Sequence, residues 1–415
     1  MPESEQCFAA FDLFFRSALQ LPEYRARRGL RYPVGFLAGL YFCAIAARRD
    51  SQMSASIWMN AHWDLLAKLW EKSSGSRLSE AARRRGPSQA TLSRYLQGCS
   101  PDEFAWYRTR AERIVFRQRW QAFLKLRRET GRKAMGAKVN DRRKLARQPN
   151  KPIPQYALDG KARAGCVSEA TGRHEIDLTL YSPDTKQVLA QRTLADKEGE
   201  PSAAVSIILA EARSLPKGIF TGDAGILSPR VVSALAKKNH DFIFGIKGNA
   251  GNVFDVIKSH PWDRMPFVSE TFFKGHGRGE MRGLKKISVS SFETPELFAK
   301  YKGVAVVFQV TRVIEKLSSG EMGKEVSYYI GGGEAAALTP REAQGYIRDH
   351  WGQESFHWVK DVVLGEDASH QKRNNGSRIL GILRTSVAEV GMRLFGSTKR
   401  FVDHFSADPR KMLEK

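Results

Sequence analysis

The order of helical and extended segments in the middle of the chain limits the possible folds more than any other feature. Residues 174–181 and 187–194 alternate apolar and polar positions, and a Ser-Pro-Asp turn at 182–184 joins them into a predicted hairpin. An apolar run at 153–159 precedes the hairpin. Helices and short strands then alternate at 201–213, 218–221, 228–238 and 241–247. Because hairpins join antiparallel strands and helical crossovers join parallel ones, the sequence predicts an α/β fold, with a mixed sheet flanked by helices.

The flanking segments differ in character and set the domain boundaries. Apolar and aromatic residues recur at helical spacing through 1–125, whereas 126–152 is rich in Arg, Lys, Asn, Gln and Pro. Alternation returns at 303–311, and Thr-Pro-Arg-Glu at 339–342 begins a predicted helix. The predicted parts are a mostly helical basic domain (1–125), a basic linker (126–152), an α/β domain (153–393) with a β-rich insertion at about 262–332, and a C-terminal tail (394–415).

Positive charge is concentrated in the first 150 residues. This segment holds 29 Lys or Arg and 13 Asp or Glu, which gives +16 of the formal net charge of +23. Such a block indicates a polyanionic partner, either nucleic acid or an acidic membrane surface, although a solvated helix surface is the simpler alternative. A Gly-Pro-Ser turn at 86–88 leads into a short helix that resembles the recognition helix of a helix-turn-helix, with an ordinary basic surface helix as the alternative. The candidate DNA contacts here are Arg83, Arg84, Arg85, Gln89, Ser93 and Arg94.

The composition disfavours several other classes of protein. The four cysteines lie far apart, which disfavours a disulfide scaffold or a cysteine-rich zinc module and fits a reducing cytoplasm. The longest apolar run, 33–47, is too short to span a bilayer and predicts a buried helix. Glu3 and Glu5 argue against a signal peptide. We therefore predict a globular cytoplasmic protein.

Three acidic residues occupy positions suited to metal-ion chemistry. Asp159 and Asp223 each follow a predicted strand beside glycines, and ligands gather at strand ends in open α/β sheets. Glu354 lies on the late predicted helix, from which its carboxylate could join the other two. Carboxylates on rigid elements suffice to hold Mg²⁺, and two such ions can activate an attacking oxygen and stabilise a leaving one in phosphoryl transfer.

Each of these acids also has a simpler interpretation. Asp159 or Asp223 alone is compatible with a turn after a strand, and Glu354 alone with a solvated helix surface. Glu366 and Asp367, which lie beyond the helical pattern, are rival candidates for the third acid.

Two histidines near Glu354 admit a further alternative. His350 is four residues before Glu354 and could pair with it, and His357 could complete a transition-metal site with both. No His-rich tract supports that site, and the sequence indicates that Trp351 and Trp358 are packing residues.

Five motifs in a fixed order carry a resemblance to a known family. They lie at 157–161, 196–200, 221–224 with 241–249, 275–282, and 348–367. Together they make residues 153–393 similar to the DDE transposases of bacterial insertion sequences, in the branch that includes the H-repeat-associated proteins. Each motif alone is weakly specific, and the resemblance rests on their order and spacing.

The resemblance implies a ribonuclease H-like catalytic domain with a β insertion before the glutamate helix. It implies a DNA transposase that cleaves and joins strands at the ends of a mobile element, with Asp159, Asp223 and Glu354 as catalytic residues and ligands of two Mg²⁺ or Mn²⁺ ions. The implied partner is double-stranded DNA, which includes the terminal repeats of the element and the target DNA. The resemblance also implies a homodimer or higher oligomer that binds this DNA in the cytoplasm, at the nucleoid, with no membrane partner. Further DNA contacts proposed with it are Lys161, Lys247, Arg278, Arg282, Arg348, His350 and Lys360.

The sequence departs from related enzymes around the glutamate. Those enzymes have a Tyr, an Arg and a Lys at fixed offsets from it, whereas His350 takes the Arg offset here and Asp361 the Lys offset. Gln353 and Ser355 stand where Ile and Asn are expected. Two alternatives therefore stay open: a metal-dependent endonuclease that cuts without strand transfer, and a domesticated DNA-binding protein with a vestigial active site.

Overall fold

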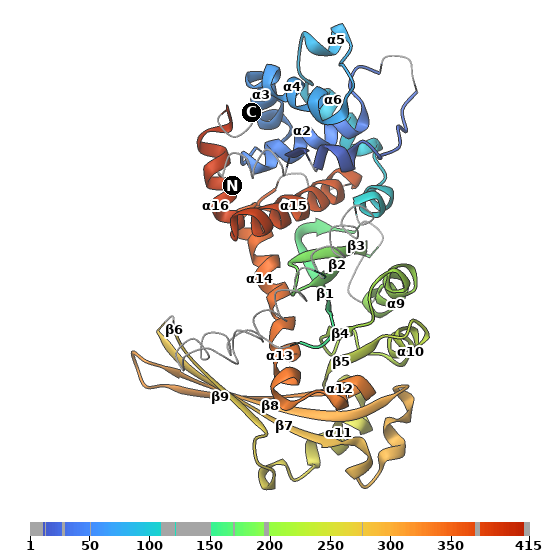
Figure 1. Ribbon diagram of the computed structural model, residues 1–415, viewed down its shortest axis with the longest axis vertical. Helices are drawn as coiled ribbons and strands as arrows, with labels where there is room; N and C mark the ends of the chain where they lie inside the picture. Colours follow the sequence, from blue (N-terminus) through green and yellow to red (C-terminus); the bar gives the residue numbers. More distant parts are fainter. Residues whose placement is uncertain are drawn as a thin grey trace.

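The computed structural model contains one nine-stranded sheet, with helices packed against its faces (Figure 1). The strand order is β3-β2-β1-β4-β5-β9-β8-β7-β6. The structure describes residues 11–12, 14–26, 30–49, 51–108, 121, 151–168, 171–194, 199–275, 277–369 and 374–410. Apart from Lys151 and Pro152, the predicted linker lies outside these residues.

The first five strands form the mixed part of the sheet, as the alternation of hairpins and helices predicted. β1 (Gln155–Val167) pairs antiparallel with β2 (His174–Ser182), which pairs antiparallel with β3 (Gln187–Leu194). On its other side β1 pairs parallel with β4 (Ile219–Gly222), and β4 pairs parallel with β5 (Asp241–Ile246).

Two crossover helices cover one face of these strands. α9 (Glu200–Glu211) leads from β3 to β4, and α10 (Pro229–Lys237) leads from β4 to β5. Their apolar residues share a core with Tyr156 and Leu158 of β1, whereas Ala157 between them belongs to the core on the opposite face. The alternation along β1 therefore divides its side chains between two cores.

Helices from both ends of the chain form the second core. α15 (Asn374–Phe395) and α16 (Thr398–Ala407) pack with the N-terminal helices over β1–β3, at the upper end of the molecule in Figure 1. Phe401 and Phe405 of α16 are fully buried. The predicted C-terminal tail therefore includes a packed helix, because its aromatic residues recur at helical spacing and face this core.

The N-terminal segment is helical, as predicted. Its helices include α2 (Val34–Ala46), α3 (Gln52–Ala61), α4 (Trp63–Ser74), α5 (Glu80–Arg83) and α6 (Gln89–Gly98). Every residue of α2 is buried, as the long apolar run predicted. Among the described helices, none combines the length and the apolar character that a bilayer crossing requires.

The β-rich insertion extends the same sheet. β6 (Ser269–Gly275), β7 (Arg278–Ser288), β8 (Val304–Lys316) and β9 (Met322–Gly332) form successive antiparallel pairs. β9 also pairs antiparallel with β5, which joins the insertion to the mixed strands. Two short helices flank these strands, α11 (Asn252–Ser259) and α12 (Gly333–Ala337).

The late helix is divided into three pieces. α13 (Pro340–His350) is followed by α14 (Gly352–Trp358) and by a π-helical turn (Val359–Val363). Thr339 begins α13 with a capping box, in which its hydroxyl accepts from the backbone N–H of Glu342 and the Glu342 carboxylate accepts from the backbone N–H of Thr339. This helix start was predicted correctly.

Replacing Thr339 by Ala is expected to lower the free energy of unfolding by about 1 kcal/mol, because one backbone N–H at the start of α13 loses its acceptor. Thermal denaturation of the full chain measures this loss. Thr339→Ser keeps the hydroxyl and should retain wild-type stability. Equal stability of the Ala variant and wild type would show that the cap does not stabilise α13.

Candidate active site

Asp159 lies on β1 and Asp223 directly follows β4, at the point where the pairing of these two parallel strands ends. The pairing of β1 with β4 stops at Leu158 and Gly222, so each aspartate is the next residue along its chain. β4 ends there, whereas β1 continues to Val167 because it remains paired with β2. Asp159 therefore lies inside a strand, which corrects its predicted place at a strand end.

The turn after β4 fixes the position of Asp223. Its Oδ1 accepts hydrogen bonds from the backbone N–H groups of Gly225, at 3.0 Å, and Ile226, at 3.1 Å. The side chain of Asn249 donates to the carbonyl oxygen of Ala224 at 2.7 Å. This Asx turn was one of the alternatives considered for Asp223, and it leaves the second carboxylate oxygen without a backbone donor among the described residues.

Glu354 reaches the same region from α14. The buried side of this helix rests on β1 and β2, where Gln353 donates to the hydroxyl oxygen of Thr179 at 2.6 Å and Phe356 packs on Tyr181. Glu354 is exposed beside that buried side. The helix thus anchors the third acid while leaving its carboxylate accessible.

Electrostatic effects show that the acids are neighbours. Burial raises the pKa of Asp159 to about 7, and the negative charges of Asp223, Glu200 and Glu354 add to that rise. Burial also raises the pKa of Glu354. Like charges that lie close together disfavour full ionisation, so a cation at this place would relieve their repulsion.

Glu200 is a further acid beside Asp159, and no role for it was predicted. This residue is buried at the start of α9, and a Cβ atom added at Gly160 would lie only 2.0 Å from its Oε1 atom. Gly160 therefore lets the Glu200 carboxylate pack against β1 next to Asp159. The one signal in the sequence was its position in the 196–200 motif.

The acids offer the donor type that a divalent cation takes. Hard cations take oxygen ligands, and Asp159, Asp223 and Glu354 supply carboxylates from three separate elements. Within the ranges that the structure describes, no three His, Cys, Asp or Glu side chains are already grouped so as to hold a metal ion. The carboxylates are thus close enough to raise the pKa of Asp159 without converging on one point.

The two histidines are buried and neutral. Burial lowers the pKa of His350 to about 4, and burial together with the charges of Lys360 and Lys161 lowers the pKa of His357 to about 3. The Nδ1 atom of His350 lies 3.2 Å from the hydroxyl of Thr221. His350 therefore does not form the surface pair with Glu354 that its spacing suggested, and its burial also disfavours its predicted contact with DNA.

Two lysines predicted to contact DNA belong to a buried ion cluster, which consists of Lys161, Lys360, Asp361, Glu366 and Asp367. Lys161 Nζ lies 2.7 Å from Asp361 and 3.3 Å from both Glu366 and Asp367, and Lys360 Nζ lies 3.1 Å from Glu366. Both lysines are buried. In this arrangement they neutralise acids inside the protein and do not face a DNA molecule.

The predicted contacts in the N-terminal segment gather around α5 and α6. Ser88 caps α6, as predicted, and the helix exposes Gln89 and Arg94, with Ser93 half-buried between them. Arg85 is exposed just before the helix. Two further exposed arginines form ion pairs on the surface, Arg83 with Glu71 and Arg84 with Glu80.

The remaining predicted contacts lie near the sheet. Lys247 follows β5 and Arg348 lies on α13, and both are exposed. Arg278 and Arg282 on β7 stand beside Glu280, which forms an ion pair with Arg282 and lies 4.0 Å from Arg278.

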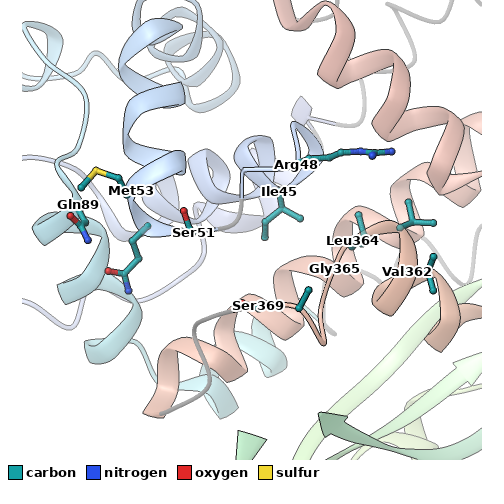
Figure 2. Close-up of a pocket in the computed structure, with 12 residues that line it drawn as sticks. Ile45, Arg48, Ser51, Met53, Gln89, Val362, Leu364, Gly365 and Ser369 are labelled. Carbon is teal, nitrogen blue, oxygen red and sulfur yellow. The ribbon is translucent and has the colours of Figure 1, made fainter. Parts of the chain in front are cut away.

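A separate cavity of about 490 Å³ lies between α2, α3 and the π-helical turn (Figure 2). Ile45, Met53, Val362 and Leu364 give it apolar walls, and Arg48 lies at its edge. Asp159, Asp223 and Glu354 do not line it. This cavity is therefore distinct from the acidic site.

Comparison with known proteins confirms the predicted resemblance. No family model matches the sequence. The chain is 28% identical over 243 residues to "Putative transposase YncI" of Escherichia coli O157:H7, a match that covers 54% of this chain and 58% of that protein. It is 26% identical to "H repeat-associated putative transposase YhhI" of Escherichia coli K12, over 55% of this chain and 61% of that protein. The match thus spans about three fifths of the length of these curated relatives.

Among solved structures, the chain shows a distant likeness to a piggyBac transposase in a synaptic complex with hairpin DNA. The TM-score is 0.43 and the identity 12%, over 99% of this chain and 82% of that one. This likeness is too low to carry an argument about fold or function.

Proposed function

We propose that the chain is a DNA transposase whose Asp159, Asp223 and Glu354 carboxylates form a catalytic Asp-Asp-Glu triad. The observation that carries the proposal is the meeting of Asp159 and Asp223 at adjacent parallel strands, with the exposed Glu354 held beside them by α14. The raised pKa of Asp159 supports their proximity. The similarity to curated proteins named as transposases gives independent support.

We also propose that β1–β5 with α9, α10 and α14 form a ribonuclease H-like core. Support comes from three antiparallel strands followed by two parallel strands joined through helices, which is the order that such a core requires. β6–β9 then correspond to the insertion that precedes the glutamate helix.

The chain's own residues would prepare the site for cleavage of a phosphodiester. The amides of Gly225 and Ile226 hold one oxygen of Asp223, and the contact of Gln353 with Thr179 fixes the helix that carries Glu354. Asp159, Asp223 and Glu354 would hold two Mg²⁺ or Mn²⁺ ions. Such ions activate an attacking oxygen and neutralise charge on a leaving one.

The proposed substrates are the terminal repeats of a mobile element and its target DNA, bound by a homodimer or higher oligomer in the cytoplasm on the nucleoid. The N-terminal basic segment would supply much of the DNA affinity, through phosphate contacts that need no metal. Exposed Gln89 and Arg94 on α6 suit a helix that enters the major groove.

DNA binding by the full chain in EDTA is expected to weaken steeply with salt. The logarithm of the affinity should fall by about 0.9 per phosphate contact for each unit of log salt. Arg94→Ala should reduce that slope by about 1 in a fluorescence anisotropy titration, whereas Arg264→Ala, an exposed arginine far along the chain, should not. A salt-independent affinity would contradict the proposed role of the basic segment.

One assay distinguishes a transposase from an endonuclease and from a DNA-binding protein without catalytic activity. The full chain is incubated with Mg²⁺ and duplex DNA that carries the native sequences flanking its gene. A transposase cleaves the DNA and joins the new ends to a target, an endonuclease cleaves without joining, and a domesticated DNA-binding protein binds without cleaving.

A further inference from the structure

The sheet has two end strands, and their outer edges differ. β3, at one end, is covered, since the Glu389 carboxylate on α15 accepts a hydrogen bond from the backbone N–H of Val188. β6, at the other end, pairs with β7 on its inner side, and no strand in the described part of the chain pairs with its outer edge (Figure 1). The outer N–H and C=O groups of such a strand are a template on which another molecule can add a strand.

The two faces of β6 also differ. Ser269 faces α13, where its hydroxyl donates to the side chain of Gln344 at 2.7 Å. The alternate residues Glu270, Phe272 and Lys274 lie on the other face and are exposed. Phe272 is 76% exposed, more than any other large apolar side chain among the described residues. The exposed row of β6 therefore consists of an acid, an aromatic ring and a base.

The two charges of this row have no partner beside them. The register with β7 places Gly283 opposite Glu270 and Gly279 opposite Lys274, so β7 offers neither charge a side chain to pair with. Lys274 lies four residues along the strand from Glu270, about 13 Å away, which is too far for the two to pair with each other. Their opposite charges are thus available to a partner at the outer edge.

We propose that β6 pairs antiparallel with β6 of a second copy of the chain, across a two-fold axis at Phe272. In that register Glu270 of each copy stands opposite the partner's Lys274, and the two Phe272 rings meet at the centre. A parallel pairing in register would set Glu270 against Glu270 and Lys274 against Lys274. The charges therefore select the antiparallel direction as well as the register, and the row is its own complement.

DNA is the other partner that this region could meet, because Arg278 and Arg282 lie on the adjacent strand. The row on β6 has no net charge, however, and the carboxylate of Glu270 would repel a phosphate. A second copy satisfies both charges and covers Phe272. This pairing gives a surface to the oligomer of the proposed function, and it rests on that proposal only in expecting an oligomer.

Sedimentation of the full chain without DNA or metal measures the pairing. The salt concentration is about 0.15 M, where repulsion between two basic chains is screened beyond about 8 Å. Glu270→Lys and Lys274→Glu should each weaken self-association about tenfold, because two opposite-charge contacts become like-charge contacts. An equimolar mixture of the two variants should associate as wild type does, since the row of one is then wholly positive and that of the other wholly negative.

The mixture also shows that both variants are folded, because a misfolded chain would not recover. Glu293→Lys reverses an exposed charge outside β6 and should leave self-association unchanged. A monomeric wild type, or a mixture that associates no better than either variant alone, would overturn the pairing. Weaker DNA binding by Lys274→Glu at unchanged self-association would overturn it too and assign β6 to DNA. Because no DNA or metal is present in the sedimentation, failure of the pairing can be told apart from failure of the proposed catalytic function.

Discussion

Glu354→Gln is expected to reduce metal-dependent DNA cleavage at least about 100-fold while DNA binding stays at the wild-type level. A metal ligand contributes more than the outer residues that orient it, whose loss already costs 10- to 100-fold. Glu354 is exposed, so the amide should not disturb α14. A cleavage gel, read together with an anisotropy titration on the same DNA, measures both effects.

A matched control tests whether the loss of cleavage is specific to Glu354 or follows from removing any surface carboxylate. Glu334→Gln makes the same chemical change at an exposed residue of α12, where Glu334 pairs with Lys217, and should leave cleavage unchanged. If Glu354→Gln cleaves like wild type while Glu366→Gln does not cleave although it is folded, the third acid of the site is Glu366.

Glu366→Gln is expected to destabilise the protein strongly and to leave the folded fraction active. Burial alone would raise the pKa of Glu366, but Lys360, Lys161, Arg163 and Arg384 outweigh it and lower the pKa to about 2. Removing this carboxylate leaves Lys161 and Lys360 buried with one acid fewer. We expect a loss of about 3 kcal/mol in the free energy of unfolding, measured by denaturant titration at neutral pH.

The same carboxylate predicts how stability depends on pH. The pKa of Glu366 is lower in the folded chain than its ordinary value of 4.5, so its stabilising effect is complete above pH 4.5 and is lost as the pH falls toward about 2. Within this window the stability of Glu366→Gln should vary less steeply with pH than that of wild type. Asp367→Asn changes a more exposed member of the cluster and should cost no more than about 1 kcal/mol. Equal pH profiles for wild type and Glu366→Gln would exclude the cluster as a source of stability.

The periodicity of the sequence predicted the mixed strands because each segment has a local signal. The hairpin from 174 to 194 needs only an alternating pattern and a turn, and the crossovers need only helical spacing. The pairing of β9 with β5 joins residues far apart in the sequence, such as Ile243 and Gly331, and no local pattern encodes which strand edge the insertion will meet. Asp159 was placed at a strand end for a related reason, because the pairing partner of β1 decides where that strand stops.

The surroundings of the candidate acids were harder to predict than the order of the strands. Lys161 and Lys360 are of the residue type that contacts DNA phosphates, but only the fold shows that they face Glu366 inside the protein. Trp351 and Trp358 are of a residue type common in protein cores, and the sequence indicated that they pack there. In the structure both side chains lie on the exposed side of the helix. Residue type alone does not predict whether a side chain faces the core or the solvent when both faces of its helix or strand carry polar and apolar residues.

Release of 3′-hydroxyl ends tests the central claim most directly. The full chain is saturated with duplex DNA carrying the native flanks of its gene, and new 3′-hydroxyl ends are counted with Mg²⁺ and with EDTA. An Asp-Asp-Glu enzyme produces these ends only with Mg²⁺ and only in wild type, whereas Asp159→Asn binds the DNA and produces none. Saturated wild-type complexes that release no 3′-hydroxyl end in Mg²⁺ would contradict the account.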